Sequence, residues 1–419
     1  MARSKVAQVF AVEWPVLVAT LRRDLGDLGL AEEVAQDAFV EAAARWGPDT
    51  TPDRPGAWLL TTARRRAIDQ IRRDQRFADR LPALAQLASV QPRPDTELID
   101  DQLALIFGCC HESLNPEAQI ALTLRQVCGL STAQIAGAFL VSPATMAKRL
   151  VRAKDKIRKA KVPFVVPEPE ELPERLAAVL RVVYLIFTAG HTNSEGSDLV
   201  RGDLCDEARW LAEVLDRLLS ARRDDGAELA SARAEVLGLR SLMLFTDARR
   251  STRIDGEGKL VLLEHQDRSR WDGELVARGQ ASLAQALALG QPGPYQVQAA
   301  IAGLHATATS WDETDWPAIA SLYLRLTQLQ PSPVVELNRA VAVSMSEGPE
   351  AGLAILDRLA EGRELDDYRY LHAARADLLR RLDRLDEAMD AYERALALGG
   401  SEAEQEFLRS RLDELDRQP

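Results

Sequence analysis

The chain has 419 residues, of which 46% are hydrophobic and 28% charged, as in soluble globular proteins of roughly two to four domains. No apolar stretch approaches the roughly 18 residues that cross a bilayer, and no signal peptide is evident, so we expect a cytoplasmic protein without a membrane partner. Residues 1–161 hold 23 basic and 19 acidic side chains, a net charge of +4, whereas the remainder holds 29 and 45, a net charge of −16. The two parts are therefore expected to have different partners.

The domain organisation follows from helical periodicity and proline. Apolar residues recur at helical spacing throughout, and strand alternation is nearly absent, so the predicted fold class is all-α. Prolines interrupt the helical pattern at residues 79–97 and 162–173. Because proline has no backbone N–H, it removes a hydrogen bond from a helix interior and so disfavours a continuous helix there. We expect two linkers that separate domains at 1–78, 98–161 and 174–419.

The segment 27–46 predicts an amphipathic helix, with Leu30, Val34, Ala38 and Ala42 on one face. An acidic face of this kind is usually solvated, but it also suits docking of a protein partner. The side chains on that second face are Glu32, Glu33, Gln36, Asp37 and Glu41.

The segment 54–76 predicts a basic helix, in which two aspartates, Asp69 and Asp74, are outnumbered by six arginines: Arg64, Arg65, Arg66, Arg72, Arg73 and Arg76. Aromatic and basic side chains together suit single-stranded nucleic acid, whose bases stack beside a positive groove. Trp58 itself is more often a core residue than a stacking platform. The arginines are the stronger indication of nucleic-acid binding.

The segment 115–160 predicts a helix-turn-helix. Ser131 is a suitable N-cap, and Ser142 followed by Pro143 gives an N-cap with proline at the first helical position. The last helix carries eight basic side chains and one aspartate up to Lys161, a net charge of +7. Such a helix can enter the major groove of DNA. A solvated basic helix is the alternative, and Leu140 stands at a turn position where glycine is common.

The C-terminal part predicts stacked helical repeats. The segment 371–400 resembles a tetratricopeptide (TPR) unit, a looser copy covers 334–365, and 316–333 reads as the second helix of an earlier unit. Each unit buries its apolar face only against its neighbours, so stacking is implied. The positions expected to pack between the helices of the best unit are Ala376, Leu379, Ala388, Tyr392 and Ala395.

Side chains that could bind a metal or catalyse a reaction form no recognisable motif. Cys109, Cys110 and His111 are adjacent, but neighbouring side chains on one helix point in different directions, so burial is expected rather than metal binding. No metalloprotease or phosphate-loop motif is present, and the histidines, among them His191 and His305, are scattered. We expect neither a cofactor nor an enzyme. A polar network is expected to be structural, with ligand binding as the alternative, and comprises Asp247 paired with Arg249, then Glu264, Asp267, Arg268 and Asp272.

The acidic helix, the basic helix and the helix-turn-helix, in this order, resemble the extracytoplasmic-function (ECF) sigma factors of the sigma-70 family over residues 8–161. The resemblance implies that region 2 (residues 1–78) binds the clamp coiled coil of core RNA polymerase and the melted downstream (−10) promoter element. It implies that region 4 (residues 98–161) reads the duplex upstream (−35) element.

The resemblance also implies roles for single residues. Those at the polymerase interface, or supporting it, are Glu33, Gln36, Asp37 and Phe39. Those at the downstream element are Trp58, Thr62, Arg64, Arg65, Arg66 and Asp69, with Arg65 standing where asparagine is common in the family. Base-reading positions hold Ala147, Lys148, Val151 and Arg152, and phosphate positions hold Thr145, Arg149 and Lys154. Because Ala147 and Val151 are short, Lys148 and Arg152 are the expected base readers.

The C-terminal extension resembles that of an ECF subgroup with a fused TPR-like domain, notably at 242–272 and 293–306. This resemblance implies that the extension regulates the sigma factor and takes a peptide or protein partner. The alternative is a helix-turn-helix transcriptional regulator with a TPR-type interaction scaffold. An enzyme fused to a DNA-binding module is the weakest reading.

Overall fold

The computed structural model describes most of the chain, and its elements are all helical. The described residues are 2–47, 50–73, 95–139, 141–191, 202–221, 226–253, 255, 261–290, 292–400 and 402–416. No strand occurs among them, which confirms the all-α prediction. The predicted linker at 79–97 falls almost wholly outside these residues, as does Leu140. No helix in the described ranges is both long and apolar enough to cross a membrane.

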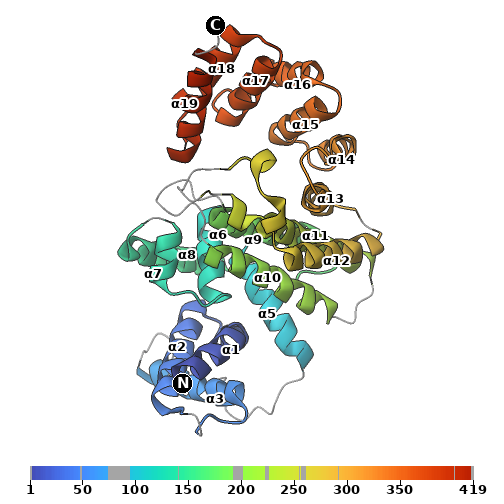
Figure 1. Cartoon of the computed structure of the whole chain (residues 1–419). Coiled ribbons are helices and arrows are strands. Elements are labelled where there is room, and N and C mark those ends of the chain that lie inside the picture. The colour runs from blue at the N-terminus through green and yellow to red at the C-terminus, as the bar shows by residue number, and fades with distance from the viewer. Residues whose placement is uncertain are drawn as a thin grey trace. The chain divides into compact units, whose positions relative to one another are not determined.

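The chain divides into two compact units. The first comprises residues 1–189 and 206–232, and the second comprises 190–205 and 233–419 (Figure 1). The sequence placed everything after residue 173 in one extension, whereas the helices just beyond that point group with the N-terminal part.

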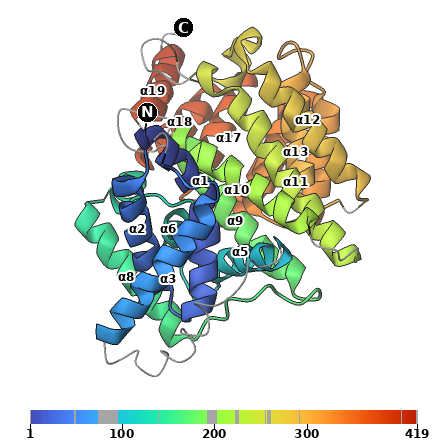
Figure 2. The ribbon, with the colours of Figure 1, turned by 90° about the horizontal axis from the view of Figure 1, so that it is seen from below.

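The first unit begins with a three-helix bundle of α1 (Ala2–Leu25), α2 (Leu28–Arg45) and α3 (Pro55–Arg73) (Figure 2). The Asp27 carboxylate caps α2 by accepting a hydrogen bond from the Leu30 backbone N–H at 2.9 Å. The core of the bundle is apolar and almost fully buried, and it includes Trp14, Leu21, Val34, Leu59 and Ile71.

The helix-turn-helix follows α5 (Asp95–Cys109) and α6 (Pro116–Gln126). It consists of α7 (Thr132–Ala138) and α8 (Pro143–Lys159). Ser131 and Gln134 form a capping box at α7, and the Ser142 hydroxyl accepts the Thr145 N–H at 3.2 Å. The two helices pack through side chains that are at most 5% exposed, namely Ile135, Ala136, Met146 and Leu150.

The proline-rich segment after α8 is non-helical until α9 (Leu172–His191). Its Phe164 packs closely on α5, because a Cβ placed at Gly108 would lie 2.5 Å from the Phe164 ring. The Arg22 guanidinium lies 4.3 Å from the centre of the same ring. This segment is therefore anchored to α1 and α5. Two further helices follow, α10 (Gly202–Ser220) and α11 (Ala227–Ala248).

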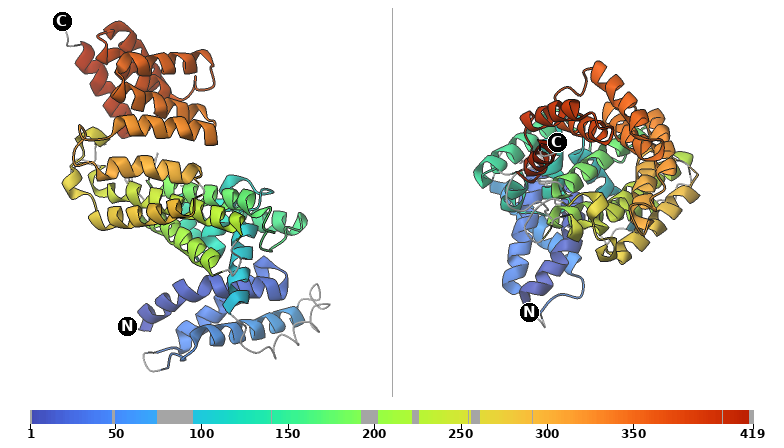
Figure 3. Two further views of the ribbon diagram at one scale, coloured as in Figure 1. Left: turned by 90° about the vertical axis from the view of Figure 1, so that its right-hand side faces the viewer. Right: turned by 45° about the horizontal axis from the view of Figure 1, so that its top comes forward.

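The second unit ends in a stack of antiparallel helix pairs (Figure 3). Three 3₁₀ turns, η2 (Arg250–Thr252), η3 (Leu263–His265) and η4 (Arg268–Arg270), precede the last eight helices. The TPR positions Ala376, Leu379, Ala388, Tyr392 and Ala395 are at most 2% exposed and share one core, which confirms their predicted packing. The helices are α12 (Gly273–Ala288), α13 (Pro294–Thr307), α14 (Trp316–Leu329), α15 (Pro333–Ser346), α16 (Pro349–Glu361), α17 (Arg369–Arg381), α18 (Leu385–Ala397) and α19 (Glu402–Asp416).

Candidate nucleic-acid and polymerase interfaces

The helix α8 separates an apolar face from an exposed basic face. Met146, Leu150, Ala153 and Ile157 are buried at helical spacing. The other face includes five predicted DNA contacts, all of them exposed: Thr145, Ala147, Lys148, Val151 and Arg152. Because Lys148 and Arg152 are four residues apart, their cationic groups follow one another along this face.

The other two predicted DNA contacts on α8 are engaged in ion pairs. Arg149 lies 3.0 Å from the carboxylate of Glu117 on α6. Lys154 lies 3.2 Å from the carboxylate of Glu32 on α2. Val151 and Lys154 also line a cavity of about 490 Å³ shared with the α1–α2 turn. One edge of α8 therefore faces the N-terminal bundle.

The predicted downstream-element residues on α3 are mostly paired within the bundle. Arg64 lies 2.7 Å from Asp24, while Arg65 and Arg66 lie 3.1 and 2.7 Å from Glu41. The hydrogen bond from Arg66 lowers the pKa of Glu41, which remains a carboxylate. These three arginines of α3 therefore have carboxylate partners that nucleic acid would have to replace.

The remaining predicted α3 residues differ in accessibility. Trp58 is half-buried and packs edge-on against Trp46, with ring centres 5.2 Å apart. Asp69 is half-buried. Thr62 is only 6% exposed, so its side chain is not available to a bound strand in this arrangement.

The predicted polymerase residues on α2 divide between surface and core. Glu33 and Asp37 are exposed, and Val40 beside them is 70% exposed. These positions fall on one side of the helix, where a partner can bind. Gln36 is half-buried. Phe39 is buried against Phe10, with ring centres 4.8 Å apart, so Phe39 packs α2 onto α1 and does not face a partner.

Glu32 is a functional candidate that the sequence reading left among the solvated acids. Its carboxylate accepts hydrogen bonds from the side chains of Arg125 at 2.7 Å, Gln126 at 2.6 Å and Lys154 at 3.2 Å. Burial raises the pKa of Glu32, but the charges of Lys154 and Arg125 outweigh it and the net pKa is lowered. We call Glu32, Arg125, Gln126 and Lys154 the interdomain latch.

A signal for the latch was present in the sequence. Glu32 has the spacing of the apolar residues Leu28, Ala35 and Phe39, which places it on the buried face of α2. An acid on such a face requires a buried partner.

Comparison with known proteins agrees with this geometry. Sigma-70 region 2 matches residues 13–77, and sigma-70 region 4 matches residues 104–157. An ECF RNA polymerase sigma factor, SigK of Mycolicibacterium vanbaalenii, is 30% identical over 31% of this chain and 68% of its own length. The chain belongs to the ECF sigma factors of the sigma-70 family. A family of unknown function, DUF6596, matches residues 175–287 of this sigma factor.

Two further relatives show how far the similarity extends. An uncharacterized protein of Rhizobium meliloti is 42% identical over 97% of this sigma factor and 94% of its own length. A probable ECF sigma factor, SigI of Mycobacterium tuberculosis, is 28% identical over 35% of this chain and 52% of the relative. The similarity to the relatives named as sigma factors is thus confined to about a third of the chain.

The polar network predicted in the extension needs one correction. Asp247 forms its ion pair with Arg250, at 2.6 Å, and not with Arg249, because α11 ends at Ala248 and the following turn redirects the chain. Asp267 and Asp272 cap the starts of η4 and α12. Arg268 donates to the backbone carbonyl of His305 at 2.7 Å.

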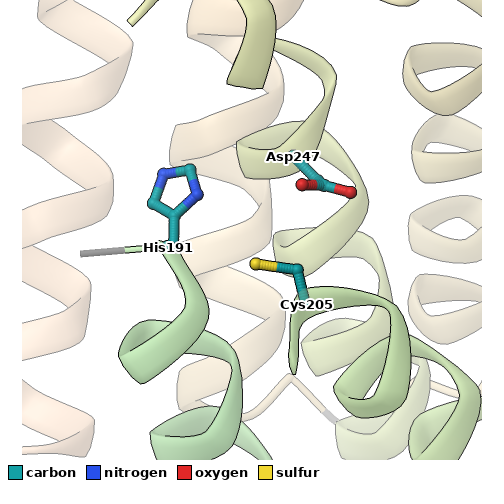
Figure 4. A group of neighbouring side chains, drawn as sticks. All are labelled: His191, Cys205 and Asp247. Carbon is teal, nitrogen blue, oxygen red and sulfur yellow. The ribbon is translucent and has the colours of Figure 1, made fainter. Parts of the chain in front are cut away.

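The sequence predicts that Cys109, Cys110 and His111 are buried and do not bind a metal. Cys109 and Cys110 are at most 2% exposed, which confirms their burial, whereas His111 beyond the end of α5 is only half-buried. Elsewhere, no motif or spacing groups His191, Cys205 and Asp247, yet the fold brings these three side chains together (Figure 4).

Proposed function

We propose that this sigma factor binds core RNA polymerase through α2 and directs initiation at specific promoters through α3 and α8. The observation that carries the proposal is the exposed basic face of α8 inside a capped helix-turn-helix, in the same structural unit as the exposed acidic side of α2. Promoter selection requires both a helix that recognises duplex DNA and a surface that binds the polymerase.

The arrangement of the first unit supports a further element of the proposal. Lys154 is held by Glu32, Arg64 by Asp24, and both Arg65 and Arg66 by Glu41. We infer that the free chain is closed and binds promoter DNA weakly. Core polymerase opens it by engaging α2, which frees Lys154 for phosphate contact.

The deciding experiment is transcription in vitro with core RNA polymerase on a library of candidate promoters. We expect core-dependent, promoter-specific transcripts from the wild type and none from Lys148→Ala combined with Arg152→Ala. The matched control is Lys156→Ala combined with Lys159→Ala, which removes the same charge from exposed positions of α8. It is expected to weaken binding uniformly without changing promoter preference.

The same assay separates the alternative function. Sequence-specific DNA binding that needs no polymerase, together with no transcription, would favour a helix-turn-helix regulator with a TPR-type scaffold. Loss of transcription with normal polymerase binding in the Lys148 and Arg152 double variant would instead support the sigma assignment.

We also propose that the C-terminal extension regulates initiation. Its support is the net charge of −16 after residue 161, which is opposite in sign to the DNA-binding part. A truncation that tests this must retain α9 and α10, because most of both helices belong to the first unit. We therefore choose truncation after Ala221. Increased transcription would indicate inhibition by the extension, and decreased transcription would indicate activation, provided that circular dichroism shows a folded product.

A further inference from the structure

A cluster of buried polar side chains lies in the second unit where α9 ends and α10 begins. His191, Cys205 and Asp247 are at most 6% exposed, and their imidazole, thiol and carboxylate atoms all lie within 4.8 Å of one another. Figure 4 shows that the three side chains converge from separate helices. Nitrogen, sulfur and oxygen donors at this spacing are typical of a transition-metal site. Whether a cation or an anion fits here depends on the charge of the surrounding side chains.

The surrounding charge is positive. Asp247 is bound through both carboxylate oxygens by Arg250, at 2.6 and 2.8 Å. Arg253 donates to the backbone carbonyl of His191. Burial, followed by the charges of Arg253, Arg249 and Arg250, lowers the pKa of His191 to about 2. The imidazole is therefore neutral, and the same positive potential would oppose a divalent cation.

Among the described residues, two of these arginines are not paired with an acid. Within the described part of the chain, neither Arg249 nor Arg253 forms an ion pair with a carboxylate. The Glu404 carboxylate, which lies near Arg253, is already held by Arg369 at 2.6 Å. Both side chains are half-buried. Cations in such positions without a counter-charge are unfavourable, and a bound anion would offset that cost.

Arg249 is the centre of the uncompensated charge. Burial and the neighbouring charge of Arg253 lower the pKa of Arg249 to about 10. Arg249 is a charged neighbour of His191 and also of His305, whose pKa is lowered to about 4 by burial and then by Arg249 and Arg268. Two neutral imidazoles therefore stand near this guanidinium, and each has an N–H to donate.

We propose that this cluster is a binding site for a small oxyanion, a phosphate or carboxylate group held by Arg249 and Arg253 with hydrogen bonds from His191 and His305. Planar guanidinium groups bind both kinds of oxyanion through paired N–H donors. The extension of this sigma factor then carries an effector site of its own. The proposal does not depend on how the first unit binds polymerase.

The test is thermal unfolding of the full chain with inorganic phosphate, pyrophosphate or succinate, each compared with sodium chloride at the same ionic strength. We expect at least one oxyanion to raise the Tm by an amount on the order of 3 °C near saturation. The phosphate and succinate arms distinguish the two ligand classes. Equal Tm values in all the salts would overturn the proposal.

Variants separate a site from a general salt effect. Arg249→Gln and Arg253→Gln should each abolish the oxyanion-specific rise, whereas Arg325→Gln removes the same charge from an exposed position of α14 and should keep it. Without oxyanion, Arg249→Gln should be at least as stable as the wild type, because repulsion from Arg253 is removed. An equal rise in wild type and Arg249→Gln contradicts the proposal.

The metal alternative has its own outcome. Zn²⁺ would raise the Tm of the wild type, and Co²⁺ would give a thiolate charge-transfer band, and Cys205→Ser would remove both effects. That result would replace the oxyanion site by a metal site.

Discussion

The Lys154 ammonium of α8 lies 3.2 Å from the Glu32 carboxylate of α2. A predicted DNA contact is thereby tied to the helix that carries the predicted polymerase contacts. The two residues are 122 positions apart in sequence, so this pair reports directly on how region 4 closes onto region 2.

Replacement of Glu32 by Gln should open the latch. An amide would place N–H donors against Arg125 and Lys154, so two half-buried cations lose their partner. We expect the free energy of unfolding to fall by about 2 to 4 kcal/mol, measured by urea denaturation. Duplex binding by the free chain should become tighter in fluorescence anisotropy, because Lys154 is released.

The control for this variant is Glu33→Gln, which makes the same chemical change at the adjacent, exposed position. It should leave stability almost unchanged and instead weaken binding to core polymerase. If Glu33→Gln and Glu32→Gln behave alike in both assays, the latch has no special role.

The stability contributed by Glu32 should depend on pH in a definite direction. Its folded pKa lies below the ordinary value of 4.5, so the unfolded chain takes up the proton more readily. The contribution is complete above the unfolded pKa and is lost as pH falls through the folded pKa. The difference in unfolding free energy between wild type and Glu32→Gln should be constant from about pH 6 to 8 and shrink below about pH 4.5. A difference that grows on acidification contradicts this account.

The close contact between α15 and α16 should not tolerate a side chain at Gly352. A Cβ there would lie 2.5 Å from the Ser344 Cβ and 2.7 Å from the Ala340 carbonyl oxygen. We expect Gly352→Ala to lower stability by roughly 1 to 3 kcal/mol. Gly273→Ala is the control, because nothing lies within 4 Å of its added Cβ. Both are measured by thermal unfolding, and equal Tm values would be the contradicting result.

The cysteines of α5 should be chemically inert in the folded chain. Burial raises the pKa of Cys110 to about 12 and that of Cys109 well above its ordinary value. Since the thiolate is the reactive form, alkylation at pH 8 should be roughly 10³-fold slower than in guanidinium chloride. Mass spectrometry after iodoacetamide treatment measures this at each site, and rapid labelling of either residue in the native chain would disprove it.

Features set by neighbours along the chain were predictable. The caps at Ser131 and Ser142 and the small residues of the TPR-like pair, Ala376 and Ala388, act within one or two helices, and the structure confirms their roles. The ion pair of Asp247 was assigned to the wrong arginine, because the end of α11 moves Arg250 rather than Arg249 into reach.

By itself, the sequence determined the helical class, the helix-turn-helix and the family resemblance, because periodicity, capping and motif order are local properties of the chain. Only the tertiary structure decided which charges meet. Glu32 and Glu33 are adjacent acids, yet one is a buried partner of Lys154 and the other is exposed. Likewise His191, Cys205 and Asp247 converge from three helices. Such encounters depend on packing between distant segments, which sets burial and thereby the strength of each electrostatic contact.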